Sequence, residues 1–252
     1  MKQINNSITK RSGIDFIKDM LSNSKILHEN IYNNSVLVIG GAGTIGSSYI
    51  KQILKFKPLK ITVVDINENG LTELTRDLRS SNLLDYNPEY ITYPVNLLSD
   101  TFDKIFNSES WQVVANFSAH KHVRSEKDKI SVEALIKNNV YGAIKLLNLC
   151  ELNPPKYFLS VSTDKAANPV NIMGASKSLM EKLILSKKQN FRVSTARFAN
   201  VAFSNGSLLD GFIYRLNKKQ PLSCPSDIKR FFVTPEQSGQ ICLLATFLGD
   251  SG

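Results

Sequence analysis

The chain has 252 residues, of which 42% are hydrophobic and 21% charged, values ordinary for a globular protein that can bury a core. Its formal net charge is +9, but the Lys and Arg residues are scattered, without the clustered stripe or module of a nucleic-acid-binding protein, so we expect no nucleic-acid partner. No run of about 18 apolar residues occurs and the polar N-terminus lacks a signal-peptide core, which predicts a cytoplasmic protein without a membrane span.

The possible metal ligands lack the spacing of a metal site. Cys150, Cys224 and Cys242 are widely separated, which suggests a reducing compartment and buried or incidental thiols. His120 and His122 are two residues apart with no third ligand in sight, so we expect no metal ion.

The first 34 residues precede the first predicted strand and form a candidate helical extension. Apolar residues fall near helical spacing at Ile14, Ile17, Leu21, Ile26 and Leu27. The sequence leaves two placements open for residues 1–34: across the main domain, or in a contact between subunits.

From residue 35 the chain alternates between strand and helix signals. Short apolar, β-branched runs predict strands at 36–39, 61–64, 90–95, 112–116, 157–162 and 192–196. Helical patterns lie between them at about 46–56, 68–79, 131–151 and 174–189. This alternation predicts an α/β, Rossmann-like, doubly wound parallel sheet over residues 35–200, followed by a partial substrate-binding region at 201–252.

A glycine-rich turn follows the first strand. Gly40, Gly43 and Gly46 stand between a predicted strand and a predicted helix, and Asp65 ends the next strand. Such glycines let the backbone amides around Thr44 and Ile45 approach a pyrophosphate at a helix N-terminus. A carboxylate at position 65 accepts hydrogen bonds from ribose hydroxyls and repels a 2′-phosphate, so we expect NAD rather than NADP.

The richest chemistry lies in the stretch 162–177, which reads S-T-D-K-A-A-N-P-V-N-I-M-G-A-S-K. It follows a predicted strand, and open α/β sheets bind ligands at the carboxyl ends of their strands. Asp164 can act as an acid or a base, and Lys165 can act as a base if its pKa is lowered. Met173 and Lys177 are four residues apart, so a helix that begins near residue 172 places both on one face.

This stretch resembles the extended short-chain dehydrogenase/reductases of bacterial polysaccharide biosynthesis, and among them the nucleotide-sugar 4,6-dehydratases. The resemblance extends over about residues 36–248, including N-F-S-A-H-K-H-V at 116–123 and R-F-A-N-V at 197–201. Members of the family continue well beyond the matched part, so the resemblance implies a substrate domain that the chain contains only in part.

The resemblance also assigns roles to individual residues. It implies catalytic roles for Thr163, Asp164, Lys165, Met173 and Lys177. Lys177, Ser118 and Ala119 would border the cofactor, and Asn96 would contact adenine, although an ordinary loop asparagine is the alternative. It places the substrate beside His120, Lys121, Asn139, Asn200 and Arg230.

Met173 occupies the position where most short-chain dehydrogenases carry a tyrosine. Methionine cannot carry a proton, so one interpretation is a non-catalytic NAD-binding protein. The other is the subgroup of 4,6-dehydratases in which methionine replaces tyrosine and the neighbouring T-D-K carries the acid–base work. The intact Thr163-Asp164-Lys165 favours the second interpretation.

The resemblance therefore implies an NAD-dependent 4,6-dehydratase of a nucleotide sugar, with UDP-N-acetylglucosamine as the expected substrate. In that reaction Asp164, or a relay through Lys177 and Thr163, removes the C4 hydroxyl proton, Lys165 takes the C5 proton, and Asp164 protonates the departing C6 hydroxyl. A C4 epimerase or a reductase is the alternative enzyme class. The family habit of pairing through two long helices implies a homodimer or higher homo-oligomer.

Overall fold

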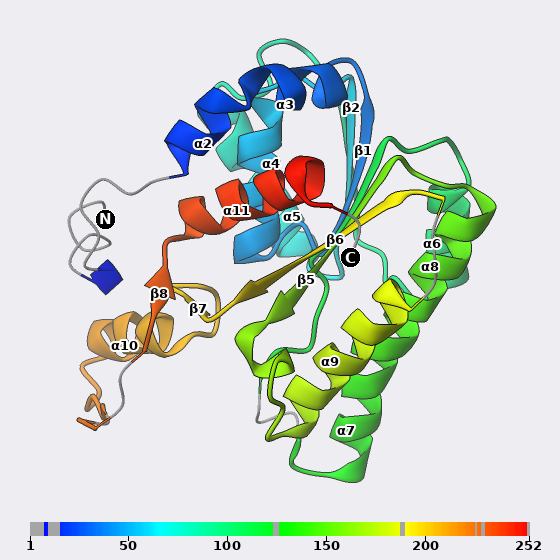
Figure 1. The fold of residues 1–252 in the computed structure, drawn as a ribbon. Coiled ribbons are helices and arrows are strands. Elements are labelled where there is room, and N and C mark those ends of the chain that lie inside the picture. The colour runs from blue at the N-terminus through cyan, green and yellow to red at the C-terminus, as the bar shows by residue number, and fades with distance from the viewer. Residues whose placement is uncertain are drawn as a thin grey trace.

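The structure is a computed structural model that describes residues 8–9, 16–122, 126–186, 190–224, 226–227 and 230–250. A six-stranded parallel sheet lies at its centre, with the strand order β3-β2-β1-β4-β5-β6 (Figure 1). The strands are β1 Ser35–Ile39, β2 Lys60–Val64, β3 Glu89–Tyr93, β4 Val113–Asn116, β5 Tyr157–Thr163 and β6 Arg192–Phe198. This order is that of a Rossmann fold, so the predicted fold class is confirmed.

The central strands are continuous apolar runs because helices cover both faces of the sheet. Four of the five residues of β1 and of β2 are buried, as are all four residues of β4. Strands buried on both faces cannot alternate polar and apolar residues. The unbroken run V-L-V-I at 36–39 was therefore the right signal for a parallel strand.

Two hydrophobic clusters hold the helices to the sheet. One cluster joins α4 Thr44–Leu54, α5 Glu68–Ser80 and α11 Pro235–Leu248 to the strands. The other joins α6 Asp100–Phe106, α8 Gly142–Leu152 and α9 Ile172–Leu185. Figure 1 shows these two groups on opposite sides of the sheet.

The helical stretch predicted at 131–151 is interrupted in the middle. Helix α7 Lys129–Ile136 begins at Asp128, whose side chain accepts the amides of Ile130 and Ser131, and a π-helical turn, Lys137–Tyr141, joins α7 to α8. Such turns are rare and are frequent at functional sites. Sequence periodicity did not locate this turn.

The helix predicted at 174–189 begins two residues earlier than expected. Asn171 accepts the amide of Gly174 and so caps α9, which starts at Ile172 and ends at Leu185. Positions 187–189 lie outside the described residues.

The described helices of the N-terminal segment pack across the main domain, the first of the two placements left open. Helices α2 Ile17–Ser22 and α3 Ser24–Ile31 insert Met20, Leu27 and Ile31 into the cluster that contains α4 and α11. The Asn30 side chain also accepts hydrogen bonds from the ammonium of Lys156 (2.9 Å) and the hydroxyl of Tyr157 (2.8 Å). Ile14 lies outside the described residues.

The C-terminal part divides into a small appendage and a helix that belongs to the core. The appendage comprises a two-stranded sheet, β7 Asn200–Val201 with β8 Phe232–Val233, and helix α10 Leu208–Asn217, none of whose residues is buried. In contrast, Cys242, Leu243 and Phe247 of α11 are buried with the strands. The division into residues 1–34, 35–200 and 201–252 stays a prediction, but both ends of the chain contribute to one core.

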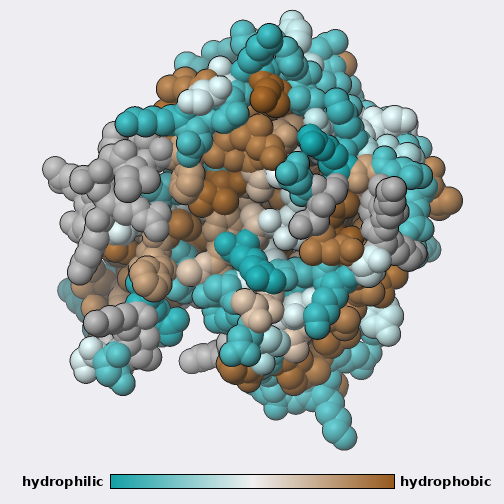
Figure 2. Space-filling model, in the orientation of Figure 1, coloured by the Kyte–Doolittle hydropathy of each residue, from teal (hydrophilic) through white to brown (hydrophobic). Residues whose placement is uncertain are grey.

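The space-filling view shows apolar surface in the middle of the face that carries α11, bordered by hydrophilic side chains (Figure 2). Within the described part of the chain, no helix is long and apolar enough to cross a bilayer. That part also contains no group of three or more His, Cys, Asp or Glu residues arranged to hold a metal ion.

We predict that Leu27→Ala lowers the free energy of unfolding by about 2–5 kcal/mol, because the side chain is fully buried in the shared core. Ile26→Ala on the same helix is the matched control: Ile26 is 43% exposed, and we expect a loss below about 1 kcal/mol. Urea unfolding of both variants measures the difference. Equal, small losses would show that the N-terminal helices are not part of the core.

Candidate active site

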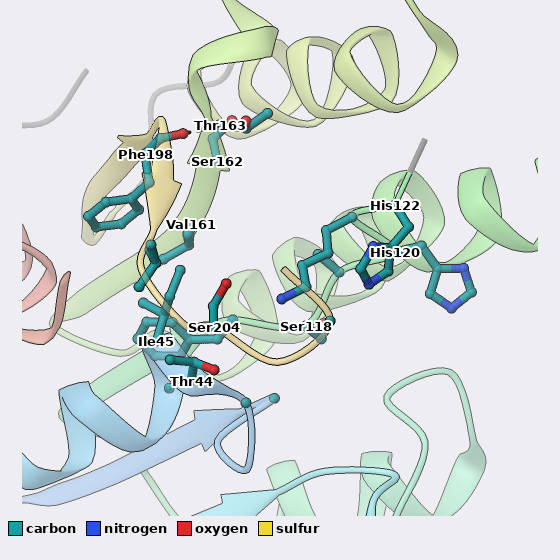
Figure 3. Close-up of a pocket in the computed structure, with 18 of the residues that line it drawn as sticks. Thr44, Ile45, Ser118, His120, His122, Val161, Ser162, Thr163, Phe198 and Ser204 are labelled. Atoms are coloured by element: carbon teal, nitrogen blue, oxygen red, sulfur yellow. Dashed lines mark hydrogen bonds between the residues drawn. The ribbon is translucent and has the colours of Figure 1, made fainter. Parts of the chain in front are cut away.

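A cleft of about 660 Å³ opens at the carboxyl ends of the strands, where the sequence predicted the chemistry. Figure 3 shows that its lining comes from distant parts of the chain, with Thr44 and Ile45 at one end and Thr163 at the other. Among the predicted site residues, those that line the cleft are Gly40, Gly43, Thr44, Ile45, Gly46, Asp65, Asn96, Ser118, Ala119, His120, Lys121, Thr163, Lys165, Met173, Lys177, Asn200 and Arg230. Asp164 and Asn139 are not part of this lining.

Two glycines of the turn after β1 are required by close contact between backbones. Gly40 has a φ of +72°, and a Cβ there would lie 2.5 Å from the amide nitrogen of Ser118. A Cβ on Gly46 would lie 2.5 Å from the carbonyl oxygen of Gly40. A side chain at either position would therefore push the turn away from β4 or from α4.

The N-terminus of α4 is left without a side-chain cap. Asn67, Ser99 and Asn171 accept first-turn amides of α5, α6 and α9, but the N-cap of α4 is Gly43, which has no side chain to do so. The first amides of a helix need outside partners, and the helix dipole favours an anion there. Because Thr44, Ile45 and Gly46 line the cleft, this end of α4 suits a pyrophosphate.

Asp65 is held beside the same turn. Its carboxylate accepts the amide of Ala42 at 3.0 Å and the amide of Asn67 at 2.9 Å. These two hydrogen bonds fix the carboxylate at the edge of the cleft, where it can also accept ribose hydroxyls. The turn, the open helix end and this carboxylate together fit an adenine dinucleotide without a 2′-phosphate.

The loop after β4 forms the opposite wall. The backbone amide and the hydroxyl of Ser118 both donate to the Asn116 side chain, at 3.0 and 2.7 Å. Asn96, in the loop after β3, also lines the cleft, and its side chain accepts the amide of Leu98 at 2.8 Å. The predicted positions of Ser118 and Asn96 are thus compatible with a cofactor contact.

Lys177 is buried, with 4% of its surface exposed, and its ammonium donates to the carbonyl oxygen of Val161 at 3.0 Å. Desolvation lowers the pKa of Lys177 to about 8, although the nearby carboxylate of Glu181 acts in the opposite direction. The structure therefore holds a lysine at the floor of the cleft that loses its proton at a lower pH than a surface lysine does.

The T-D-K triplet is split between the cleft and its rim. Thr163 and Lys165 line the cleft, whereas Asp164 is exposed. The Asp164 carboxylate accepts the Thr163 hydroxyl at 2.9 Å and the Lys165 ammonium at 3.3 Å. A proton could pass between the three groups, and Asp164 would reach a substrate either through Thr163 or after a side-chain rotation.

Met173 faces the cleft from the first turn of α9 and is buried, with 3% of its surface exposed. Its backbone amide donates to the Glu126 carboxylate at 2.8 Å. Glu126 thereby ties the segment after His122 to the helix that carries Lys177. Sequence reasoning did not identify Glu126, because it lies 47 positions before Met173 in the chain.

Asn139 supports the cleft from behind. It sits in the π-helical turn, where its side chain accepts the amide of His120 at 2.9 Å and donates to the carbonyl of His120 at 3.0 Å. It also donates to the Ser176 hydroxyl on α9 at 3.0 Å. Asn139 thus positions His120 relative to α9 and does not itself line the cleft, so it acts on the site through His120.

The sequence analysis also missed an ion pair that positions α9 on the sheet. Glu181, one turn beyond Lys177, is buried and binds the Arg197 guanidinium through two hydrogen bonds of 2.9 and 2.5 Å. Arg197 lies opposite Ser162 in the β5–β6 register. The pair therefore clamps α9 to the strand ends that carry the T-D-K triplet. The i, i+4 spacing of Lys177 and Glu181 was the available signal.

The substrate side of the cleft is formed by the appendage and the histidine segment. The Asn200 side chain donates to the carbonyl oxygen of Phe231 at 3.1 Å, which joins β7 to the segment before β8. Desolvation lowers the pKa of Lys121, partly opposed by the carboxylate of Asp210, although the residue as a whole is exposed. Lys121 and Arg230 give this side positive charge that suits a diphosphate.

Comparisons with known proteins identify the family. The model of the family described as "Polysaccharide biosynthesis protein" matches residues 36–252. The chain belongs to this family. Its predicted membership of the extended short-chain dehydrogenase/reductases that modify nucleotide sugars is confirmed.

Several curated proteins are similar to the chain. An uncharacterized membrane protein of Methanocaldococcus jannaschii is 33% identical over 88% of this chain and 66% of its own length. An inverting UDP-N-acetylglucosamine 4,6-dehydratase of Campylobacter jejuni is 30% identical over 83% of this chain and 62% of its own length. The capsular polysaccharide biosynthesis protein CapD of Staphylococcus aureus is 28% identical over 90% of the chain and only 38% of its own length. The chain thus spans between about a third and two thirds of these relatives.

Solved structures share the fold. Pen from Bacillus thuringiensis has a TM-score of 0.74 and 25% identity, over 85% of this chain and 67% of its own. WbmF of Bordetella bronchiseptica, solved with NAD⁺, has a TM-score of 0.69 and 18% identity, over 88% of this chain and 72% of its own.

We predict a pH-dependent difference in stability between the wild type and Lys177→Met. Between pH 8 and 10.5 the unfolded chain keeps the Lys177 proton while the folded protein loses it, so wild-type stability gains up to about 3 kcal/mol as the pH rises through this window. The variant lacks this gain. Its stability relative to the wild type should therefore be highest below pH 8 and fall towards pH 10.5.

Urea unfolding at several pH values measures this difference. Lys182→Met, at an exposed position of the same helix, is the matched control and should show no such trend. A constant difference between Lys177→Met and the wild type would contradict the desolvated state of Lys177.

Proposed function

We propose that the protein is an NAD-dependent 4,6-dehydratase of UDP-N-acetylglucosamine, acting in the biosynthesis of a surface polysaccharide or glycan. The observation that carries the proposal is the intact Thr163-Asp164-Lys165 triplet beside Met173 and the buried Lys177, at the end of a dinucleotide cleft. Two Campylobacter jejuni relatives, at 30% and 29% identity, bear the name of this dehydratase. Because the chain matches only part of those relatives, the activity of the whole protein is part of the proposal.

The residues of the cleft would hold NAD along its length. The amides at the start of α4 bind the pyrophosphate, Asp65 binds the adenosine ribose, and Lys177 binds the nicotinamide ribose. When bound, NAD supplies a hydride acceptor that returns the hydride within the same cycle, so no external reductant is needed.

The chain's own groups then move the protons. Thr163 orients the C4 hydroxyl and passes its proton to Asp164, to which its own hydroxyl is already bonded. A ketone at C4 acidifies the C5 proton, and Lys165, the base that faces the cleft, takes this proton and returns it to C5 after the C6 hydroxyl has left. Asp164, in contact with Lys165, protonates the C6 hydroxyl as it leaves as water.

Met173 distinguishes the proposed dehydratase from an epimerase. Rickettsia relatives at 28% identity are named UDP-glucose 4-epimerase, and in that class we expect a proton-carrying tyrosine at position 173. Met173 is buried against the cleft, and its thioether can shape the cleft but cannot titrate. The acid–base work consequently falls on Thr163, Asp164 and Lys165.

Incubation of the protein with UDP-N-acetylglucosamine and catalytic NAD⁺ should convert the sugar nucleotide to a product lighter by one water, without net NADH. Mass spectrometry and absorbance measure the two quantities. Lys165→Ala should lower kcat by about a hundredfold or more, because it removes the base for C5, and should leave NAD binding unchanged.

An unchanged substrate mass with UDP-, GDP- and dTDP-linked sugars, in protein that binds NAD, would refute the dehydratase and favour the non-catalytic interpretation. Stoichiometric release of oxidised cofactor from NADH would favour a reductase. A C4 epimer without loss of water would favour the epimerase.

We further propose a homodimer that pairs through the helices α7 to α9. These helices carry apolar side chains that are exposed in the single chain, at Ile130, Tyr141, Leu152, Leu179 and Leu185. Sedimentation analysis should give a dimer, and Tyr141→Glu should shift it towards monomer because it places a charge in an apolar contact. A wild-type monomer at all concentrations would contradict this pairing.

A further inference from the structure

A short segment of the appendage crosses the cleft above the glycine-rich turn. Residues 203–207, here called the strap, connect β7 to α10. Ser204, Gly206 and Ser207 line the same cleft as Gly40, Gly43 and Gly46. In Figure 3 Ser204 lies next to Thr44 and Ile45, and the ribbon continues past Ser118.

A hydrogen bond fixes the strap to the cofactor half of the site. The backbone amide of Asn205 donates to the hydroxyl of Thr44, the first residue of α4, at 3.0 Å. The two residues are 161 positions apart in sequence. Thr44 lies at the uncapped N-terminus of α4, which suits a pyrophosphate. Its hydroxyl therefore holds the strap directly beside the expected pyrophosphate site.

The rest of the strap is shaped to reach this position. Phe203 and Gly206 have φ values of +53° and +72°, a conformation that is uncommon for a bulky residue such as Phe203. The amide of Gly206 donates to the Asp210 carboxylate at 2.9 Å, and a Cβ on Gly206 would lie 2.9 Å from the ring of His122. The strap therefore spans the cleft from α4 to the histidine segment.

The appendage holds the two ends of the strap unequally. Val201 and Ala202, just before the strap, are buried, whereas no residue of α10, which follows it, is buried, and β7 and β8 pair over only two residues each. Segments with few buried contacts open at low free-energy cost. A single hydrogen bond at Thr44 can therefore shift the balance between a closed and an open strap.

We propose that the Thr44 hydroxyl latches the strap over the cofactor's pyrophosphate and so slows cofactor release. The Thr44 hydroxyl acts through Asn205, so the Thr44 side chain is a positioning group. The Thr44 backbone belongs to the amides that bind the pyrophosphate. A retained cofactor suits a reaction in which the hydride returns to the same substrate. This proposal depends on the proposed function only for the identity of the cofactor.

The test uses Thr44→Val, which keeps the β-branched shape and removes the hydroxyl, and Thr44→Ser, which keeps the hydroxyl. Amide hydrogen exchange in free protein should be roughly three- to tenfold faster at Asn205 in the valine variant and near wild type in the serine variant, as expected for the loss of one hydrogen bond. NADH release, followed by fluorescence after displacement with excess NAD⁺, should accelerate by a similar factor in the valine variant alone.

Gly206→Ala provides a second, independent variant, because its added Cβ displaces the strap from His122 without touching α4. It should also accelerate NADH release.

Unchanged exchange at Asn205 in Thr44→Val would overturn the latch, even if release accelerates, since the hydroxyl would then act on the cofactor directly. Faster exchange with unchanged release would also overturn it. Failure of the wild type to bind NADH would instead contradict the proposed function, and the exchange data would still test the hydrogen bond.

Discussion

The close approach of the turn after β1 to the loop after β4 is the constraint on which the rest of the site depends. Gly40 lies against the backbone of Ser118 at a distance that leaves no room for a Cβ. This contact brings the open N-terminus of α4 and the loop that begins with Ser118 to the same edge of the sheet. The two walls of the cleft are therefore set by backbone geometry, before any functional side chain is considered.

Buried charged side chains of α9 give the cleft its reactivity. Lys177 is inserted beneath the cleft, where desolvation keeps its pKa low, and Glu181 offsets part of that cost. Arg197 in turn compensates the buried Glu181 carboxylate, since an unpaired charge there would be costly. The chain Lys177, Glu181, Arg197 thus links the reactivity of the site to the attachment of α9 on β6.

The two halves of the cleft differ in how firmly they are held. The cofactor half rests on strands and helices that share fully buried side chains, including those of the N-terminal helices. The substrate half rests on the appendage, whose helix has no buried residue and whose strands are short. Substrate recognition is therefore expected from elements that adjust on binding, and cofactor recognition from elements that are already in place.

The sequence by itself determined the fold class, the strand positions within about two residues and the glycine turn with Asp65. These features are local: strand runs and the spacing of Gly40, Gly43 and Gly46 depend on neighbours in the chain. It also located the stretch 162–177, since strand, turn and helix follow one another there without a break.

Only the tertiary structure decided which side chains meet across long sequence separations. The exposed position of Asp164, the support of His120 by Asn139, the bond from the Met173 amide to Glu126 and the bond between Thr44 and Asn205 all depend on how distant segments pack. The packing of the N-terminal helices was also decided by the tertiary structure. The spacing of their apolar residues predicted helices but not the surface against which they pack. Periodicity shows that a face will be buried, whereas the partner that buries it is fixed by the three-dimensional arrangement of the whole sheet.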